Sequence, residues 1–233
     1  RVAHEQPIID ELVGLLSIPN IAADEPNIRR NANHLRSMFE RRGFTVTFAE
    51  TPTRGPIIFA ELAAPGATRT VVFYAHYDGQ PVDPKAWTGS GPFEPALRTG
   101  AIDAGAALRP FPAAGTPYQD DWRIYARSAS DDKSPIVALL AAVDALAAAG
   151  IHRAVHLKVV LDSEEENGSP GLGPALAAHP GRVKGDVLLT GDGPVHQSGR
   201  PLVSYGNRGV LDFNLTVYGP ARGLHSGHYG NWA

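Results

Sequence analysis

The sequence predicts an α/β fold in which a mostly parallel central sheet is flanked by helices. Two observations lead to this prediction. Stretches with apolar residues at helical spacing alternate along the chain with short runs rich in β-branched and aromatic residues. The run over residues 71–74 (VVFY) is continuously apolar, which is typical of a strand covered on both faces, as in a parallel sheet. The alternating order of helices and strands therefore favours a layered α/β domain.

Two helices and three strands are expected in the first part of the chain. Apolar residues recur at helical spacing over residues 4–18, and this pattern stops at Pro19. A second helix is predicted over residues 27–42, with Gly43 as its stop signal. Three β-rich runs, separated by proline and glycine, follow at residues 44–49, 57–62 and 70–75.

The central part of the chain contains a long segment without clear periodicity. Residues 80–122 are rich in proline, glycine and alanine, and loops of this length in compact domains are usually functional or mobile. After it, an alanine- and leucine-rich pattern predicts a helix over residues 134–149. Further strands are expected at residues 155–161 and 187–190, with a short helix at residues 171–179 between them.

The pattern changes again from Arg200 onward. Residues 210–218 alternate between polar and apolar side chains, which predicts a half-exposed antiparallel strand. We interpret this change as the start of a second domain near Gly206. The expected organisation is a main domain over residues 1–205 and the beginning of another domain over residues 206–233.

The composition is that of an ordinary globular protein and excludes several classes of function. The 233 residues are 43% hydrophobic and 19% charged, and the formal net charge of −3 offers no basic surplus for binding nucleic acid. No apolar run approaches the ~20 residues needed to span a membrane. The chain has no cysteine, which excludes disulfides and cysteine-containing zinc sites and leaves His, Asp and Glu as metal ligands.

The composition alone does not decide the cellular compartment. A cytoplasmic protein and a disulfide-free periplasmic one would both lack cysteine. The sequence begins at Arg1 rather than at methionine, so a signal peptide could have preceded it. We expect a cytoplasmic location and leave a periplasmic or secreted one open.

Acidic residues and a histidine follow the ends of the predicted strands. Ligands of α/β folds usually bind just past the carboxyl ends of the strands, which meet at one edge of the sheet. The residues concerned are His76, Asp78, Asp131, Glu164, Glu165, Glu166 and Asp192. So many carboxylates in one place would repel one another strongly without a cation. Asp78 could fix the tautomer of His76, and one glutamate could act as a general base. The sequence therefore predicts a metal centre.

Each of these features also has a simpler explanation when taken alone. A histidine two residues from an aspartate after a strand is often a turn or surface pair. Asp131 and Asp132 could form the N-terminal cap of the helix that follows them. Three consecutive glutamates are usually a solvated face, and Asp192, between two glycines, is typical of a turn. Their occurrence together, at several strand ends, is what favours a metal centre.

Three motifs resemble those of a family of co-catalytic two-metal peptidases. They lie at residues 76–78 (HYD), 129–133 (ASDDK) and 165–169 (EENGS). The family includes carnosinase, bacterial dipeptidases, glutamate carboxypeptidase, aminoacylase and succinyl-diaminopimelate desuccinylase. Trp87, followed by PFEP at residues 92–95, is similar to the dipeptidase branch. The resemblance implies a phosphorylase/hydrolase-like catalytic domain with an inserted α+β lid or dimerisation domain, and a homodimer formed through that lid.

The resemblance also implies a role for each residue of the site. The ligands of two divalent metal ions would be His76, Asp131, Glu166 and Asp192. Asp131 would bridge both ions, for which zinc is our first choice and manganese the alternative. Glu165 would be the general base and acid, and Asp78 would orient His76. His225 would reach across the dimer and stabilise the oxyanion of the tetrahedral intermediate.

The activity implied by the resemblance is hydrolysis of peptide bonds in short peptides. Aspartate at position 192 is typical of the dipeptidases, whereas the deacylases tend to have glutamate there, so a dipeptidase is favoured. The alternatives are an N-acyl amino acid deacylase or desuccinylase that uses the same site, and a non-catalytic scaffold of this fold. The peptide bond between Asp131 and Asp132 is expected to be cis, as it often is in the family.

Three departures from the family pattern stand out. Residues 126–128 are ARS where the family usually has Gly-Arg-Gly, and the segment over residues 93–122 is longer than in relatives. The sequence also ends before the histidine that, in the family, completes the second metal site. We therefore expect the site to lack one ligand in this chain, which by itself could be inactive.

Overall fold

The computed structural model describes residues 4–193, 196, 198, 200, 202–206, 208–209 and 211–227. The chain divides into two compact units, Arg1–Gly193 and Pro194–Ala233, and each is described by itself. All strands and helices named below belong to the first unit. The division into domains after residue 205 stays a prediction.

The first unit is built on a five-stranded sheet with the order β1-β2-β7-β3-β8. These strands are β1 (Thr45–Ala49), β2 (Ile57–Leu62), β7 (Val155–Asp162), β3 (Arg69–His76) and β8 (Val187–Thr190). Strand β3 runs parallel to β7 and β8, whereas β2 runs antiparallel to β1 and β7. The sheet is therefore mixed, and the expectation of a mostly parallel sheet holds for β7, β3 and β8. The short connection between β1 and β2 explains part of the difference, because parallel neighbours need a longer crossover.

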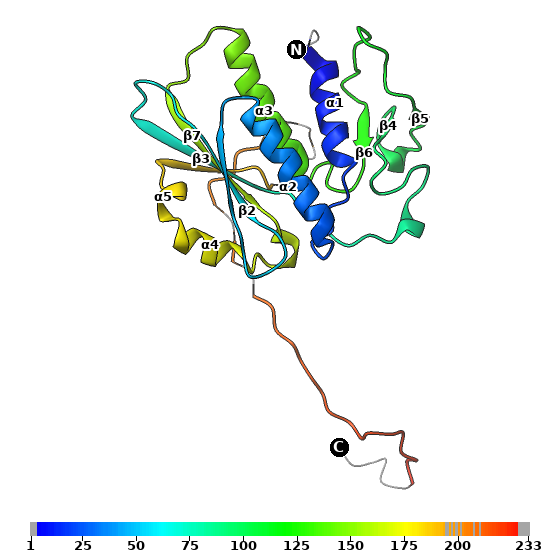
Figure 1. Cartoon of the computed structure of the whole chain (residues 1–233). Coiled ribbons are helices and arrows are strands. Elements are labelled where there is room, and N and C mark those ends of the chain that lie inside the picture. The colour runs from blue at the N-terminus through cyan, green and yellow to red at the C-terminus, as the bar shows by residue number, and fades with distance from the viewer. Residues whose placement is uncertain are drawn as a thin grey trace. The chain divides into compact units, whose positions relative to one another are not determined.

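Helices cover both faces of this sheet (Figure 1). On one face lie α1 (Glu5–Leu16), α2 (Glu25–Glu40) and α3 (Lys133–Ala148), and on the other lie α4 (Leu172–Ala178) and α5 (Pro180–Val183). Successive side chains of β2 point to opposite faces of the sheet. Ile58 packs in the hydrophobic cluster that includes residues of α1, α2 and α3, whereas Phe59 packs in the cluster that includes residues of α4 and α5. Apolar burial on both faces is the main stabilising term of such a layered fold.

Helix α2 begins two residues before the predicted start at residue 27. The side chain of Asp24 accepts a hydrogen bond from the backbone N of Asn27, and Pro26 lies in the first turn. An aspartate cap followed by a proline in the first turn is a favourable helix start. The aspartate side chain accepts a hydrogen bond from a free backbone N–H group, and proline has no N–H group that would need a partner. The capping signal therefore marks the start better than the apolar pattern does.

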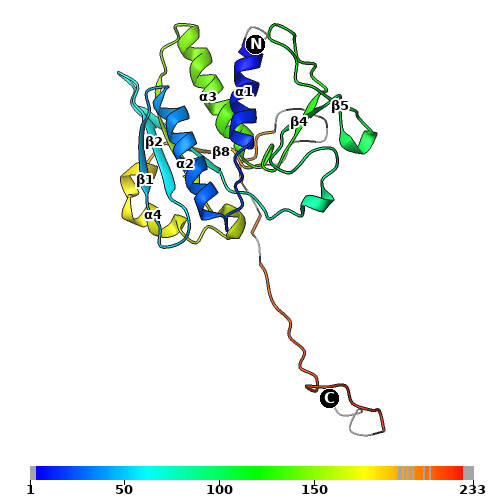
Figure 2. The same cartoon turned by 45° about the vertical axis from the view of Figure 1, so that its right-hand side comes forward.

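The long segment over residues 80–122 folds against α1 as part of a second, three-stranded antiparallel sheet (Figure 2). Its strands, in the order β5-β4-β6, are β4 (Ala96–Arg98), β5 (Leu108–Arg109) and β6 (Arg123–Tyr125). A 3₁₀ turn, Pro84–Ala86, precedes β4, and another, Ile102–Ala104, lies between β4 and β5. The backbone N of Tyr118 donates to the carboxylate of Glu5 in α1 at 3.1 Å. Strands of two or three residues are too short for a periodic pattern, so the sequence did not predict this sheet.

The expected strand over residues 210–218 is wrong for the part that the structure describes. Residues 211–218 form no strand. An antiparallel strand needs hydrogen bonds to a neighbouring strand, and the described residues of the second unit contain no strand that could be that neighbour. An alternating pattern alone therefore does not make a strand.

Among the described residues, no helix is both long and apolar enough to cross a lipid bilayer.

Candidate metal centre

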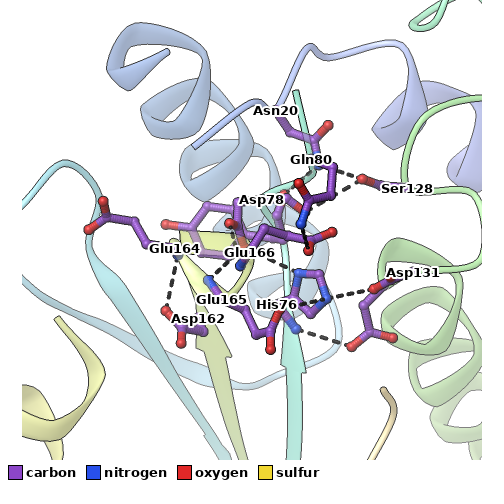
Figure 3. Close-up of polar contacts among 12 residues, drawn as sticks. Asn20, His76, Asp78, Gln80, Ser128, Asp131, Asp162, Glu164, Glu165 and Glu166 are labelled. Carbon is purple, nitrogen blue, oxygen red and sulfur yellow. Dashed lines mark hydrogen bonds and ion pairs between the residues drawn. The ribbon is translucent and has the colours of Figure 1, made fainter. Parts of the chain in front are cut away.

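The predicted site residues meet where three parallel strands end. His76, the last residue of β3, lies opposite Asp162, the last residue of β7, and Tyr74 of β3 lies opposite Thr190 of β8. The segments that follow these strands therefore start side by side at one edge of the sheet, as expected for a parallel arrangement. Figure 3 shows the side chains that they bring together.

His76 stands at the centre of the site and is fully buried. Its Nδ1 lies 3.2 Å from Oδ1 of Asp78, and its Nε2 lies 2.7 Å from Oδ1 of Asp131. The Oε2 atom of Glu165 lies 3.9 Å from the same Nε2. One ring nitrogen thus contacts a buried carboxylate, while the other faces the more exposed acidic groups. This is the arrangement in which a second carboxylate fixes the tautomer of a metal-binding histidine.

Asp78 connects two parts of the site. Besides contacting His76, this buried carboxylate accepts hydrogen bonds from the backbone N–H groups of Glu165 at 3.1 Å and Glu166 at 3.2 Å. These two residues begin a 3₁₀ turn, Glu165–Asn167, directly after β7. Asp78 therefore orients both the imidazole and the turn that carries the two glutamates.

The three consecutive glutamates have different environments. Glu164 is buried, and its Oε2 accepts a hydrogen bond from the backbone N of Arg54 at 3.3 Å. In Figure 3 its side chain points away from His76. Glu165 and Glu166 are partly exposed, and Oε2 of Glu166 accepts a hydrogen bond from Nε2 of Gln80 at 2.6 Å. The simple explanation of the run as a solvated face is therefore wrong for Glu164.

Asp131 and Asp132 are joined by a cis peptide bond, as the family resemblance implies. Asp132 stands at the N-cap position of α3, but its side chain makes no capping hydrogen bond within the described helix. Instead, its buried carboxylate accepts a hydrogen bond from the backbone N of His76 at 3.1 Å. Asp131 carries a side chain that is 62% exposed and directed to His76. The alternative explanation of this pair as a simple helix cap is therefore wrong.

Two overlapping groups of side chains have the spacing of metal ligands. The ligand atoms lie within 4.8 Å of one another in each group. The first group is His76, Asp131 and Glu166, and the second is His76, Glu165 and Asp192. Imidazole and carboxylate donors suit zinc and manganese, so the residues present fit a divalent cation. Both Glu165 and Glu166 reach the site, and the geometry leaves open which of them is a ligand.

The charges of the site suit a divalent cation. Burial opposes a charge on His76, but the carboxylates of Asp78, Asp132 and Asp131 outweigh it and raise the pKa of His76 to about 10. Burial also raises the pKa of Asp132 to about 7. The pKa of Glu165 is raised by burial first and then by neighbouring carboxylates such as Asp192. Negative charge is thus in excess here, and a divalent ion would neutralise it.

The sequence did not single out two further residues of the site. Gln80 contacts Glu166, and Asn20 donates to Oγ of Ser128 beside the turn that carries Asp131. Gln80 lies two residues after the HYD motif and could have been found by its position. Asn20 is distant in sequence from every motif, so no local signal marks it.

A family profile adds a comparison to this geometry. The profile of peptidase family M20/M25/M40 matches residues 72–206, which is more than half of the chain. The chain belongs to this peptidase family. The match includes every site residue described above except Asn20.

Relatives in the M20 family act on different substrates. The chain is 28% identical to the Cys-Gly metallodipeptidase dug1 of Schizosaccharomyces pombe, over 95% of this chain and 45% of the relative. It is 30% identical to the succinyl-diaminopimelate desuccinylase of Acidovorax ebreus, over 67% of this chain and 35% of the relative. A solved structure of the M20 metallo-carboxypeptidase Sso-CP2 from Sulfolobus solfataricus matches with a TM-score of 0.66 at 28% identity. The match covers 83% of this chain and 39% of the Sso-CP2 chain. The chain thus spans less than half the length of these relatives.

His225 belongs to the second unit, Pro194–Ala233. Its Nδ1 accepts a hydrogen bond from the backbone N of Gly227 at 3.0 Å. Because the two units are described separately, its predicted role at the active site is untested and stays a prediction.

Proposed function

We propose that the protein to which this chain belongs is a metal-dependent peptidase that hydrolyses short peptides, with dipeptides as its substrates. The single observation that carries this proposal is the pair of overlapping ligand groups that share His76. Membership of the M20 family and the similarity to a named metallodipeptidase support it.

Two divalent ions, zinc first and manganese second, are part of the proposal. The residues of this chain that would hold them are His76, Asp131, Glu166 and Asp192, and Asp131 would serve both ions. When bound, such ions polarise the scissile carbonyl and make water more acidic. Asp78 holds His76 in the orientation that leaves Nε2 facing the site.

Glu165 is the general base and acid of the proposed reaction. Its carboxylate takes the proton of the attacking water and then passes it to the leaving amine. Burial and nearby carboxylates raise the pKa of Glu165 above its ordinary value, which makes it a better proton acceptor than an unperturbed glutamate. Because its backbone N–H is held by Asp78, the base is positioned by the same residue that orients His76.

A deacylase that uses the same site is the second candidate, because a desuccinylase is among the relatives. The two activities differ in what lies on the acyl side of the bond that is cleaved. A panel of dipeptides, N-acetyl amino acids and N-succinyl amino acids, assayed on the intact protein, separates them. We expect kcat/KM for the best dipeptide to exceed that for the acylated amino acids by about tenfold or more. The opposite ranking would replace the dipeptidase by the deacylase.

The same assay addresses the non-catalytic alternative. A chelator should abolish the activity, and added zinc or manganese should restore it. A scaffold protein would turn over none of the three substrate classes with either metal.

A homodimer formed through a lid domain, with His225 of one subunit near the site of the other, completes the proposal and is tested by the oligomeric state of the intact protein.

Metal binding is expected to release protons near neutral pH. Carboxylates raise the pKa of His76 to about 10 in the metal-free chain, so its imidazole is protonated at pH 7 and must lose that proton to become a ligand. The metal affinity should therefore rise with pH up to about 10. Titration calorimetry in buffers of different ionisation enthalpy should show the release of about one proton from this residue. A binding heat that does not depend on the buffer would contradict this prediction.

A further inference from the structure

The segment that follows α1 lies between the two loops that carry the site residues. One loop, residues 77–80, follows β3, and the other, residues 128–132, precedes α3, which begins at Lys133. The backbone of Ile21 forms a parallel bridge with Gly79 of the first loop. Residues 18–20, which we call the connecting segment, make hydrogen bonds to both loops.

Asn20 makes the contacts of the connecting segment on the side of the HYD motif. Its fully buried side chain donates from Nδ2 to the carbonyl of Tyr77 at 2.8 Å and to Oγ of Ser128 at 2.9 Å. Its own carbonyl accepts a hydrogen bond from the backbone N of Gly79 at 2.8 Å. One amide group thus joins the start of both loops, and Figure 3 shows Asn20 and Ser128 directed toward each other.

The packing at this junction is close around Gly79. A Cβ atom built on Gly79 would lie 2.5 Å from Oγ of Ser128 and 3.2 Å from Nδ2 of Asn20. Only glycine permits this close approach. The two loops are therefore in close contact with each other and with Asn20 at this point.

Lys133 makes the contacts of the connecting segment on the side of α3. This fully buried lysine donates from Nζ to the carbonyls of Leu15 at 2.8 Å and Ile18 at 3.0 Å. Leu15 lies in the last turn of α1 and Ile18 just after it, and burial lowers the pKa of Lys133 well below its usual range, so the two hydrogen bonds rather than a charge hold its Nζ here. The backbone N of Lys133 also closes the loop by donating to the carbonyl of Ser128 at 3.2 Å.

Asp131 depends on these neighbours for its position. Its side chain is 62% exposed and contacts His76, so its surroundings do little to hold it. The next two residues are fully buried and bonded: Asp132 to the backbone of His76, and Lys133 to the end of α1. The exposed carboxylate is thus anchored by its two buried successors.

We propose that Lys133 and Asn20 are positioning residues, which hold the loop that carries Asp131 and the loop that follows His76 at the separation that a metal pair requires. This inference rests on the proposed metal site, but it concerns two residues that touch neither metal nor substrate. Positioning residues around a metal ligand typically affect metal affinity by about 10- to 100-fold.

The test uses Lys133→Met in the intact protein, which keeps the length of the side chain and removes the Nζ donor. Lys158→Met is the matched control, because Nζ of Lys158 also bridges two backbone carbonyls, those of Gly181 and Lys184, away from the site. Both variants and the wild type are titrated with Co²⁺, with the absorption spectrum of the bound ion as the readout of ligand geometry.

The Lys133→Met variant is expected to bind Co²⁺ about tenfold or more weakly than the wild type and with a changed spectrum. The control should keep the affinity and spectrum of the wild type. Unchanged Co²⁺ affinity and spectrum in folded Lys133→Met would overturn the inference while the proposed function stands. If the wild type itself binds no Co²⁺, the proposed function fails instead.

A second variant keeps the inference testable if Lys133→Met does not fold. Asn20→Ser shortens the side chain that joins Tyr77 and Ser128 and leaves Lys133 in place. It is expected to weaken Co²⁺ binding in the same direction, and the same loss in Asn20→Leu, which keeps the approximate size of the side chain and removes its amide, would separate the lost hydrogen bonds from a loss of packing. Wild-type Co²⁺ binding in Asn20→Ser would contradict the role of Asn20.

Discussion

Replacing Glu165 by alanine is expected to lower dipeptide turnover by about 10²- to 10⁴-fold while the metal content of the intact protein stays unchanged. The reason is that Glu165 supplies the proton transfer of the proposed reaction and is not one of the proposed ligands. Steady-state kinetics and elemental analysis of the same preparation measure the two quantities. Wild-type turnover in Glu165→Ala would remove Glu165 from the mechanism.

The control for this experiment is the neighbouring Glu164→Gln variant. Glu164 is buried and accepts a hydrogen bond from the backbone N of Arg54, and glutamine keeps an acceptor for that bond. Turnover is expected to stay at the wild-type level. A loss of metal in Glu165→Ala would show instead that Glu165 is a ligand, as its place in the group with His76 and Asp192 allows. The roles of Glu165 and Glu166 would then be exchanged.

Replacing Asp131 by alanine is expected to abolish activity and to lower the metal content of the intact protein from about two ions per chain to about one or fewer. Asp131 is the proposed ligand of both ions, so its loss weakens both sites at once. Its side chain is 62% exposed, and therefore the fold should lose little stability. Metal content, activity and thermal unfolding together distinguish a lost ligand from a lost fold.

Asp144→Asn is the matched control for Asp131→Ala. Asp144 lies in the last turns of α3, the helix that Asp131 precedes, and pairs with Arg42 at 2.6 Å. The variant should keep the wild-type metal content and activity. Two ions still bound in Asp131→Ala would contradict the bridging role and would leave His76, Glu166 and Asp192 to hold the metals.

The sequence predicted the elements with a clear apolar pattern well, including the short strand β8, and it did not predict the strands of three residues or fewer. Helices α1 and α3 and strands β2, β3 and β7 fall within a few residues of their predicted ranges, because their apolar periodicity extends over several turns or along the whole strand. The strands β4, β5 and β6 have three residues or fewer and leave no periodic signal. Strand direction was also predicted only in part, since direction depends on the connections and on the partner strand.

The order of residues along the chain is enough to specify the kind of chemistry and the side chains that can perform it. The motifs at residues 76–78, 129–133 and 165–169 contain the ligand types and indicate the family. Each motif is a short run of consecutive residues, so its identity does not depend on how the chain folds.

The orientation of each side chain, and the support behind it, depends on tertiary contacts. Glu164 is turned into the protein while Glu165 and Glu166 face His76, because Asp78, 86 residues earlier in the sequence than Glu164, binds the backbone of the turn after β7. The contacts of Asn20 and Lys133 are of the same kind. Their partners are close in space and far apart in sequence, and no local pattern records a contact of that kind.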